Sequence, residues 1–127
     1  MNLEFPEKDP LTEKIIGCAI EVHKALGPGL LESTYESALC VELQLAGINF
    51  QRQLVVPVTY KNHPVGDYRL DLLVEKSVIV EIKSVDRFDP IFEAQLLAYL
   101  KIAGIKRGML LNFSSRLLKD GFKRLVL

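Results

Sequence analysis

The stretch YRLDLLVEKSVIVEIK, residues 68–83, decides the fold of this chain. Residues 68–75 and 78–84 both alternate between two sets of side chains, with the period of two that is typical of β-strands. One face of the first strand is predicted to carry Tyr68, Leu70, Leu72 and Val74, and the other Arg69, Asp71, Leu73 and Glu75. Because only a short turn separates the two segments, they are predicted to be neighbours in one sheet.

Charged side chains interrupt both strands. Asp71 lies in the middle of the first, while Glu81 and Lys83 share one face of the second. A buried carboxylate is costly unless it is paired or bound to a metal, and carboxylate oxygens suit a hard cation such as Mg²⁺ or Mn²⁺. Lys83 suits a phosphate oxygen or an attacking water. This spacing predicts a metal site, and a solvated charge cluster on the sheet is the alternative interpretation.

The length of the turn between the strands tests the metal hypothesis. A two-residue loop would set Asp71 opposite Ile82, on a different face from Glu81. A three-residue loop, residues 75–77, would set Asp71 opposite Glu81 on one face. The metal hypothesis therefore predicts a three-residue loop, a five-residue loop or a bulge.

Helix signals flank the strands. Asp9-Pro10 and Asp89-Pro90 each combine an N-cap with proline at the first helical position, and they predict helices over about 10–26 and 88–103. Another helix is predicted from near Leu30 to just before Gly47, where glycine ends it. Its inner face is predicted to carry Leu31, Tyr35, Ala38 and Leu45.

Three further segments have strand character, namely 51–60, 107–113 and 122–127. Pro57 cannot donate to a strand ladder and places 51–60 at an edge or bulge. Helix 88–103 is predicted to be a crossover that returns a parallel strand. We therefore predict an α/β fold (an α+β mixed sheet) of order α-α-β-β-β-α-β, with a further strand from the tail and helices flanking a central mixed sheet. Residues 1–127 are predicted to form one domain, with 1–9 as a flexible N-terminal segment.

Composition excludes several classes of protein. A chain of 127 residues is too short for two independent cores, and its 16 Lys and Arg balance 16 Asp and Glu. Zero net charge argues against a polycation that coats nucleic acid or anionic membrane. No apolar run approaches the ~20 residues of a membrane span, and the start lacks the character of a signal peptide. Cys18 and Cys40 are interpreted as buried free thiols, so we expect a cytoplasmic protein without a membrane partner.

Four blocks of sequence in this order, GPGLLESTYE, YRLDLLVE, VIVEIKS and EAQLLAYL, resemble the PD-(D/E)XK nuclease superfamily. The resemblance is closest to the branch named for a GxxExxY motif, which is Gly29–Tyr35 here and follows Val22-His23-Lys24. The similarity covers residues 11–127 and implies a restriction-endonuclease-like core. This chain departs from the superfamily pattern in having Leu70, a residue that is not a ligand, in place of proline before Asp71.

The resemblance implies a metal-dependent nuclease that hydrolyses phosphodiester bonds, with DNA favoured over RNA. Asp71 and Glu81 would bind Mg²⁺ or Mn²⁺, with the backbone carbonyl of Ile82 as a third ligand. Lys83 would orient or activate the water nucleophile and stabilise charge on the phosphate. Glu32 would reach the same site directly or through a metal-bound water.

Further residues are expected to support that site. Gln95 and Tyr99 lie four residues apart on one helix face, and they resemble a Gln-x-x-x-Tyr element that supports the site or contacts DNA in exonuclease-like branches. The alternative is that Tyr99 is core and Gln95 covers its edge. Tyr35 either hydrogen-bonds Glu32 or packs in the core. His23 is interpreted as a core or supporting histidine rather than a metal ligand.

Two alternatives to a free-standing nuclease stay open. One is a non-catalytic nucleic-acid-binding or assembly module that retains the fold. The other is a nuclease that acts as a homodimer or within a larger complex, because a small chain offers little surface to grip a duplex. Residues 101–127 carry seven bases and one acid. These bases either line an approach for the phosphate backbone or mix with the acids of the first half in the folded molecule.

Overall fold

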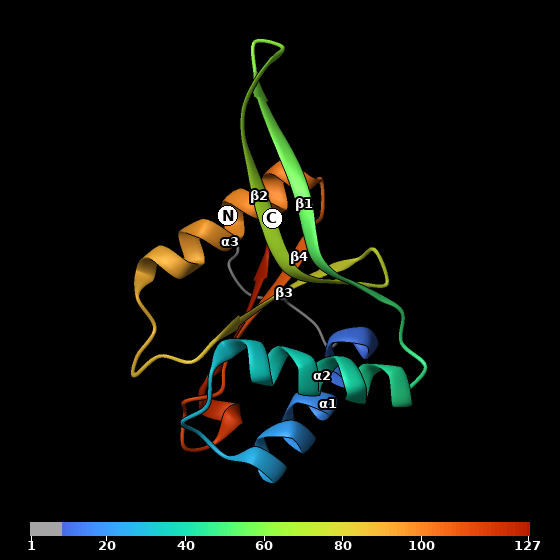
Figure 1. The fold of residues 1–127 in the computed structure, drawn as a ribbon, viewed down its shortest axis with the longest axis vertical. Helices are drawn as coiled ribbons and strands as arrows, with labels where there is room; N and C mark the ends of the chain where they lie inside the picture. The colour runs from blue at the N-terminus through green and yellow to red at the C-terminus, as the bar shows by residue number, and fades with distance from the viewer. Residues whose placement is uncertain (1–8) are drawn as a thin grey trace.

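The computed structural model describes residues 9–127 and contains three α-helices, a 3₁₀ turn and one five-stranded sheet in that range (Figure 1). Its elements are α1 (Pro10–Leu26), α2 (Glu32–Leu45), β1 (Phe50–Tyr60), β2 (His63–Val74), β3 (Val78–Lys83), α3 (Pro90–Ala103), β4 (Arg107–Asn112), η1 (Leu118–Asp120) and β5 (Phe122–Val126). The predicted α-α-β-β-β-α-β-β order is confirmed, and η1 is an addition that the sequence patterns did not indicate.

The sheet is mixed and its strands lie in chain order, β1-β2-β3-β4-β5. Neighbouring strands are antiparallel except β3 and β4, which are parallel and joined through α3. The predicted crossover is therefore confirmed. Helices α1 and α2 cover one face of the sheet and α3 covers the other, so the two faces bury separate apolar clusters.

The two clusters assign each strand side chain to a face. Leu72, Val74 and Val80 pack with α1 and α2, while Leu73 and Ile79 pack with α3. Leu70 also belongs to the α3 cluster, which corrects the prediction that it shares a face with Leu72. Strict alternation fails here because β2 bends as it leaves the sheet.

The helix ends follow the predicted chemistry. The Asp9 carboxylate accepts hydrogen bonds from the backbone N–H groups of Leu11 and Thr12, and Asp89 does the same for Ile91. Gly104 ends α3 with a φ of 70°, which glycine adopts without a Cβ penalty. Asp9 is thus the N-cap of α1 and not part of a flexible segment, and it also forms an ion pair with Arg107. The rest of the predicted flexible segment, residues 1–8, lies outside the described residues.

The buried face of α2 differs from the prediction. Tyr35 is buried, but Leu31 and Leu45 are 73% and 77% exposed. Leu31 precedes the first helical turn, and Leu45 lies ten residues after Tyr35, about 80° away around the helix. The face that packs on the sheet contains Tyr35, Glu36, Leu39, Cys40 and Leu43.

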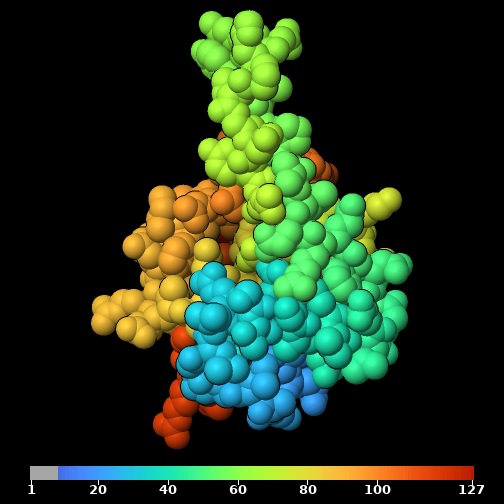
Figure 2. All heavy atoms as spheres, in the orientation of Figure 1, coloured from blue at the N-terminus to red at the C-terminus, as the bar shows by residue number. Residues whose placement is uncertain are grey.

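Strands β1 and β2 continue beyond the sheet as a two-stranded arm that stands away from the body (Figures 1 and 2). A two-residue turn, Lys61-Asn62, closes the arm with φ values of 48° and 67°. Pro57 lies in the outermost strand, and a register shift occurs between Val58 and Thr59. The predicted edge position of this strand is confirmed.

Two predictions from composition concern the whole chain. Cys18 and Cys40 are buried and free, as expected. None of the helices within residues 9–127 has both the length and the apolar character needed to cross a membrane.

Gly108 in β4 provides a test of how closely α3 packs on the sheet. A Cβ at this position would lie 2.9 Å from the side chain of Leu96. We predict that Gly108→Ala lowers the free energy of unfolding by about 1–3 kcal/mol, because this interface cannot take an extra methyl group without moving. Gly17→Ala is the control, since nothing lies within 4 Å of the added Cβ on α1; this variant should gain about 0.5–1 kcal/mol. Urea denaturation measures both, and equal effects would contradict close packing at Gly108.

Candidate functional site

A three-residue turn brings Asp71 and Glu81 together. Val74 of β2 pairs with Val78 of β3, so residues 75–77 form the loop that the metal hypothesis required. The regular ladder runs back as far as the pair Leu72–Val80. This register puts Asp71 opposite Glu81, as the three-residue alternative predicted.

Side chains replace the backbone ladder beyond that point. The backbone N–H of Asp71 donates to Glu81 Oε2 at 3.3 Å, and the N–H of Ile82 donates to Asp71 Oδ2 at 2.8 Å. Each carboxylate therefore accepts a hydrogen bond from a backbone N–H of the opposite strand, in place of the backbone carbonyl that a regular ladder would use. The strands separate here, and β2 turns into the arm.

A polar pocket of about 120 Å³ lies at this separation. Side chains from α2, β2, β3, α3 and β4 line it: Glu32, Arg69, Asp71, Glu81, Lys83, Phe92, Gln95, Leu96, Tyr99 and Leu110. Six of the residues singled out from the sequence, Glu32, Asp71, Glu81, Lys83, Gln95 and Tyr99, thus meet around one cavity. Figure 2 shows the surface hollowed between α3, the base of the arm and the start of α2.

Glu81 is in an unfavourable environment for a charged carboxylate. Its side chain is buried, and its Oε1 atom has no hydrogen-bond partner among residues 9–127. Burial, reinforced by the neighbouring charge of Asp71, raises the pKa of Glu81 from 4.5 to about 9. A cation at this point would remove both the missing contact and the repulsion between the carboxylates.

The donor set fits a divalent hard cation. Within residues 9–127, no three side chains of His, Cys, Asp or Glu converge closely enough to form a complete metal cage. The pocket offers Asp71 and Glu81 instead, and Mg²⁺ binds typically through one or two carboxylates while keeping several waters. Ile82 donates its N–H to Asp71, so its backbone lies at the same place.

Lys83 lies inside the pocket and is half-buried. Its Nζ atom is 4.5 Å from the centroid of the Phe92 ring, a cation–π contact that holds the ammonium group near the carboxylates. Sequence reasoning missed Phe92 and Arg69 as lining residues. Phe92 precedes Gln95 and Tyr99 at helical spacing, and Arg69 precedes Asp71 by two strand positions, so periodicity was the available signal.

Gln95 and Tyr99 face the pocket from α3. Tyr99 is half-buried and packs against Tyr68 of the arm, with 5.9 Å between ring centroids. Burial, together with the negative charge of Glu81, raises the pKa of Tyr99. Its hydroxyl group therefore keeps its proton near neutral pH and remains a hydrogen-bond donor.

Glu32 lies at the exposed rim of the pocket, at the first position of α2. Its Oε2 atom accepts a hydrogen bond from the backbone N–H of Ser84 at 3.2 Å, and the Ser84 hydroxyl donates to the carbonyl of Leu30. These bonds tie the segment after β3 to the start of α2.

Tyr35 and His23 lie outside the pocket. The Tyr35 hydroxyl bonds to the backbone of Gly27 and Leu30, and its ring stacks on Phe113 at 4.6 Å between centroids. Of the two predicted roles for Tyr35, the structure has the packing one. His23 is buried and donates from Nε2 to the carbonyl of Ser115 at 2.8 Å, which agrees with a core histidine.

Three of the seven basic residues after position 100 are paired with acids. Arg107, Lys123 and Arg124 form ion pairs with Asp9, Glu93 and Glu13. In the part of the chain that the structure describes, none of the seven lines the pocket. The cations there are Arg69 and Lys83, which β2 and β3 bring beside the acids. Two of the tail bases, Arg107 and Arg124, pair with acids of the first half, as the mixing alternative expects.

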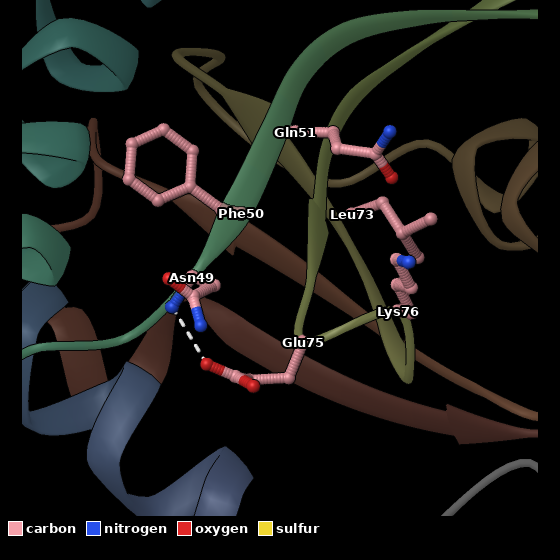
Figure 3. Close-up of a pocket in the computed structure, with 6 residues that line it drawn as sticks. All are labelled: Asn49, Phe50, Gln51, Leu73, Glu75 and Lys76. Atoms are coloured by element: carbon pink, nitrogen blue, oxygen red, sulfur yellow. Dashed lines mark hydrogen bonds between the residues drawn. The ribbon is translucent and has the colours of Figure 1, made fainter.

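A second pocket, of about 170 Å³, lies beside the start of β1 (Figure 3). It is lined by Asn49, Phe50, Gln51, Leu73, Glu75 and Lys76. Its carboxylate, Glu75, already accepts a hydrogen bond from the backbone N–H of Asn49 at 2.6 Å. The lining therefore offers no unsatisfied acid comparable with Glu81.

Comparisons with known proteins agree with this architecture. A family model described as the PD-(D/E)XK nuclease superfamily matches residues 9–125. The solved structure described as "Crystal structure of SSO0001" resembles this chain with a TM-score of 0.57 and 14% identity, over 92% of this chain and 58% of that one. At that identity the likeness concerns the fold alone, and this chain spans under two thirds of that structure. No curated protein matches this chain. The α/β architecture is consistent with a restriction-endonuclease-like fold.

Glu81 makes stability depend on pH in a definite direction. Because its folded pKa of about 9 exceeds the ordinary value of 4.5, the folded protein holds a proton that the unfolded chain releases, and stability falls as pH rises through that range. We predict that the Tm of wild-type protein in EDTA declines more between about pH 5 and about pH 9 than the Tm of Glu81→Gln.

Glu21→Gln, on the exposed side of α1, is the matched control and should retain the decline of the wild type. Differential scanning fluorimetry measures all three proteins. A decline of equal size in Glu81→Gln would contradict the raised pKa.

Proposed function

The chain belongs to the PD-(D/E)XK nuclease superfamily, and from this premise we propose that it is a metal-dependent nuclease that hydrolyses phosphodiester bonds in DNA. The observation that carries the proposal is the facing pair Asp71 and Glu81, with an unpartnered buried oxygen on Glu81 and an ammonium group in the same pocket. We further assign the chain to the GxxExxY branch, on the motif Gly29–Tyr35. Two buried free thiols suit a reducing compartment, and we propose the cytoplasm.

Asp71 and Glu81 are the proposed carboxylate ligands of Mg²⁺ or Mn²⁺, and the carbonyl of Ile82 is the proposed third protein ligand. When bound, such a cation supplies a water of lowered pKa and offsets the charge that grows on the phosphate. Glu81 must lose its proton to serve as a ligand, so a cation and a proton compete for it. The orphaned Oε1 atom supports the assignment, because a ligand would complete its contacts.

Lys83 is the proposed partner of the attacking water and of a non-bridging phosphate oxygen. Its ammonium group carries three donors and is confined by the Phe92 ring. Glu32 at the rim would hold a water of the cation. Arg69 adds a second cation from β2, and Gln95 and Tyr99 offer neutral donors from α3. A phosphodiester entering from the open side would thus meet positive and neutral donors beside the three carboxylates Glu32, Asp71 and Glu81.

The alternative function is a non-catalytic nucleic-acid-binding or assembly module that keeps this fold. A decayed site would be expected to lose its acids or its lysine. Here Asp71, Glu81 and Lys83 are all present and line one pocket, which favours catalysis.

Cleavage of DNA distinguishes these functions. We predict that wild-type protein with Mn²⁺ cleaves at least one of linear, nicked, branched and single-stranded DNA, and that Lys83→Ala and Asp71→Asn each lower the rate by about 100-fold or more. Lys14→Ala on the exposed side of α1 and Asp120→Asn at the end of η1 are matched controls that should keep the rate, because both side chains are exposed and neither lines the pocket. Cleavage that survives Lys83→Ala would identify a contaminant, and absence of cleavage with retained binding would favour the alternative.

We also propose that the nuclease acts as a homodimer through its arm. A single chain of 127 residues offers little surface to hold a duplex, and the arm exposes Val55, Tyr60, Val65 and Tyr68. We predict a dimer by analytical ultracentrifugation and a monomer after Val65→Asp, with Lys76→Asp as the control outside the arm. A monomeric wild type would contradict the homodimer and favour a larger complex.

A further inference from the structure

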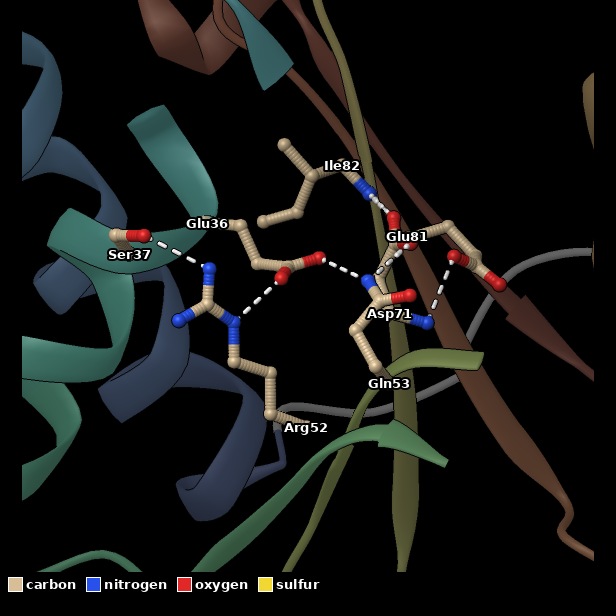
Figure 4. A network of polar contacts seen from close by, with 7 residues as sticks. All are labelled: Glu36, Ser37, Arg52, Gln53, Asp71, Glu81 and Ile82. Atoms are coloured by element: carbon tan, nitrogen blue, oxygen red, sulfur yellow. Dashed lines mark hydrogen bonds and ion pairs between the residues drawn. The ribbon is translucent and has the colours of Figure 1, made fainter. Parts of the chain in front are cut away.

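We propose that Gln53 is a positioning residue for Asp71, held in place by Glu36 and Arg52. The inference rests on the proposed function, since Asp71 needs a fixed orientation only as a ligand. It assigns to residues of α2 and of the outermost strand, β1, the role of holding Asp71 in its orientation. The network is drawn in Figure 4.

The backbone of Gln53 has an unusual conformation. Its φ is 51°, in the left-handed region that residues other than glycine rarely adopt. Among residues 9–127, the other four non-glycine residues with positive φ lie in the two hairpin turns, at 61–62 and 75–76. Gln53 instead lies inside β1, and the ladder passes from Arg52–Leu72 to Leu54–Leu70 without it. Strain of this kind persists where the surroundings impose it, and it concentrates at functional sites.

The side chain of Gln53 joins two carboxylates. Its Nε2 atom donates to Glu36 Oε1 at 2.8 Å and lies 3.4 Å from Asp71 Oδ1, a longer hydrogen bond. One amide nitrogen carries two hydrogens, so it can serve both acceptors. The other oxygen of Asp71 accepts from the N–H of Ile82, so both of its oxygens are oriented by donors.

Glu36 anchors the amide. Its side chain is buried, and its Oε2 atom pairs with Arg52 Nε at 2.6 Å. Arg52 also donates from Nη2 to the hydroxyl of Ser37 at 2.7 Å. A buried carboxylate destabilises the fold unless it is paired and hydrogen-bonded. Glu36 meets both conditions, because Arg52 pairs with one oxygen and Gln53 donates to the other. The left-handed backbone is what allows the adjacent side chains of Arg52 and Gln53 to reach the same carboxylate.

This arrangement connects the site to α2 at two levels. Glu32 lies at the pocket rim, and Glu36, one turn later on the same helix, holds Gln53 behind Asp71. Partners that orient a metal ligand typically change metal affinity about 10- to 100-fold when they are removed. A purely structural clasp between α2 and β1 would instead change folding stability and leave metal affinity alone.

The experiment compares two identical substitutions in β1, using Mn²⁺ alone as the probe. Gln53→Gly relieves the positive φ but removes the hydrogen bond to Glu36, so these two effects oppose each other in Tm. We expect a small change in Tm together with an apparent Kd for Mn²⁺ about 10-fold weaker. Gln51→Gly, two residues earlier where φ is not positive, should lower Tm and leave the Kd unchanged. Titration calorimetry gives the Kd, and scanning fluorimetry in EDTA gives Tm.

Conservative variants sharpen the result. Gln53→Asn keeps an amide and accepts the left-handed conformation, but it is one methylene shorter and should weaken Mn²⁺ binding almost as much as Gln53→Gly. Glu36→Gln keeps the volume of the anchor and should weaken binding partially. If the wild-type protein binds Mn²⁺ and the Gln53 variants bind it with the same affinity, this inference alone is overturned. A wild type that does not bind Mn²⁺ overturns the proposed function and this inference with it.

Discussion

The structure depends on two acids that face each other across β2 and β3, one buried and one partly buried. Like charges at this separation repel, and burial adds a desolvation cost. Glu81 responds with a pKa of about 9, so the metal-free protein holds a proton where a ligand would be charged. This unfavourable pair exists because the register of a three-residue turn leaves no other position for the two side chains.

Hydrogen bonds around the end of β3 help to offset the unfavourable energy of this pair. The segment after β3 is held on one side by Ser84, which bonds to α2. On another side, the buried amide of Asn112 accepts from the N–H of Val85 and donates to its carbonyl. Tyr35 fixes the loop before α2 by bonding to Gly27 and Leu30. Elements distant in sequence therefore converge on the segment that follows β3 and fix the end of the strand that carries Glu81 and Lys83.

The sequence was informative where local chemistry decides the outcome. The Asp-Pro pairs and glycines placed α1 and α3, and alternation placed β2 and β3. Whether the two acids share a face depended on the length of the turn, which local patterns left open. Prediction was weaker where tertiary packing decides. Leu31 and Leu45 look like core residues by hydrophobicity, but the sheet meets a different face of α2. Arg52 and Glu36 are 16 residues apart, and their local sequence patterns do not predict that they form an ion pair. The positive φ of Gln53 is likewise a consequence of contacts rather than of residue type.

The location of the site at one side of the sheet follows from these constraints. A left-handed residue inside a strand breaks the ladder, and a central strand would then leave buried backbone groups unpaired on both sides. Strand β1 is outermost and has only one neighbour, so it loses pairing on one side alone. An outermost strand can therefore accommodate the conformation of Gln53. Asp71 must lie in the strand next to that edge to receive the amide, and Glu81 in the strand after it. The same separation of strands that opens the pocket also sends β1 and β2 outward as an arm. The pocket and the arm thus both begin where β2 leaves regular pairing with β3, and Gln53 contacts Asp71 at that point.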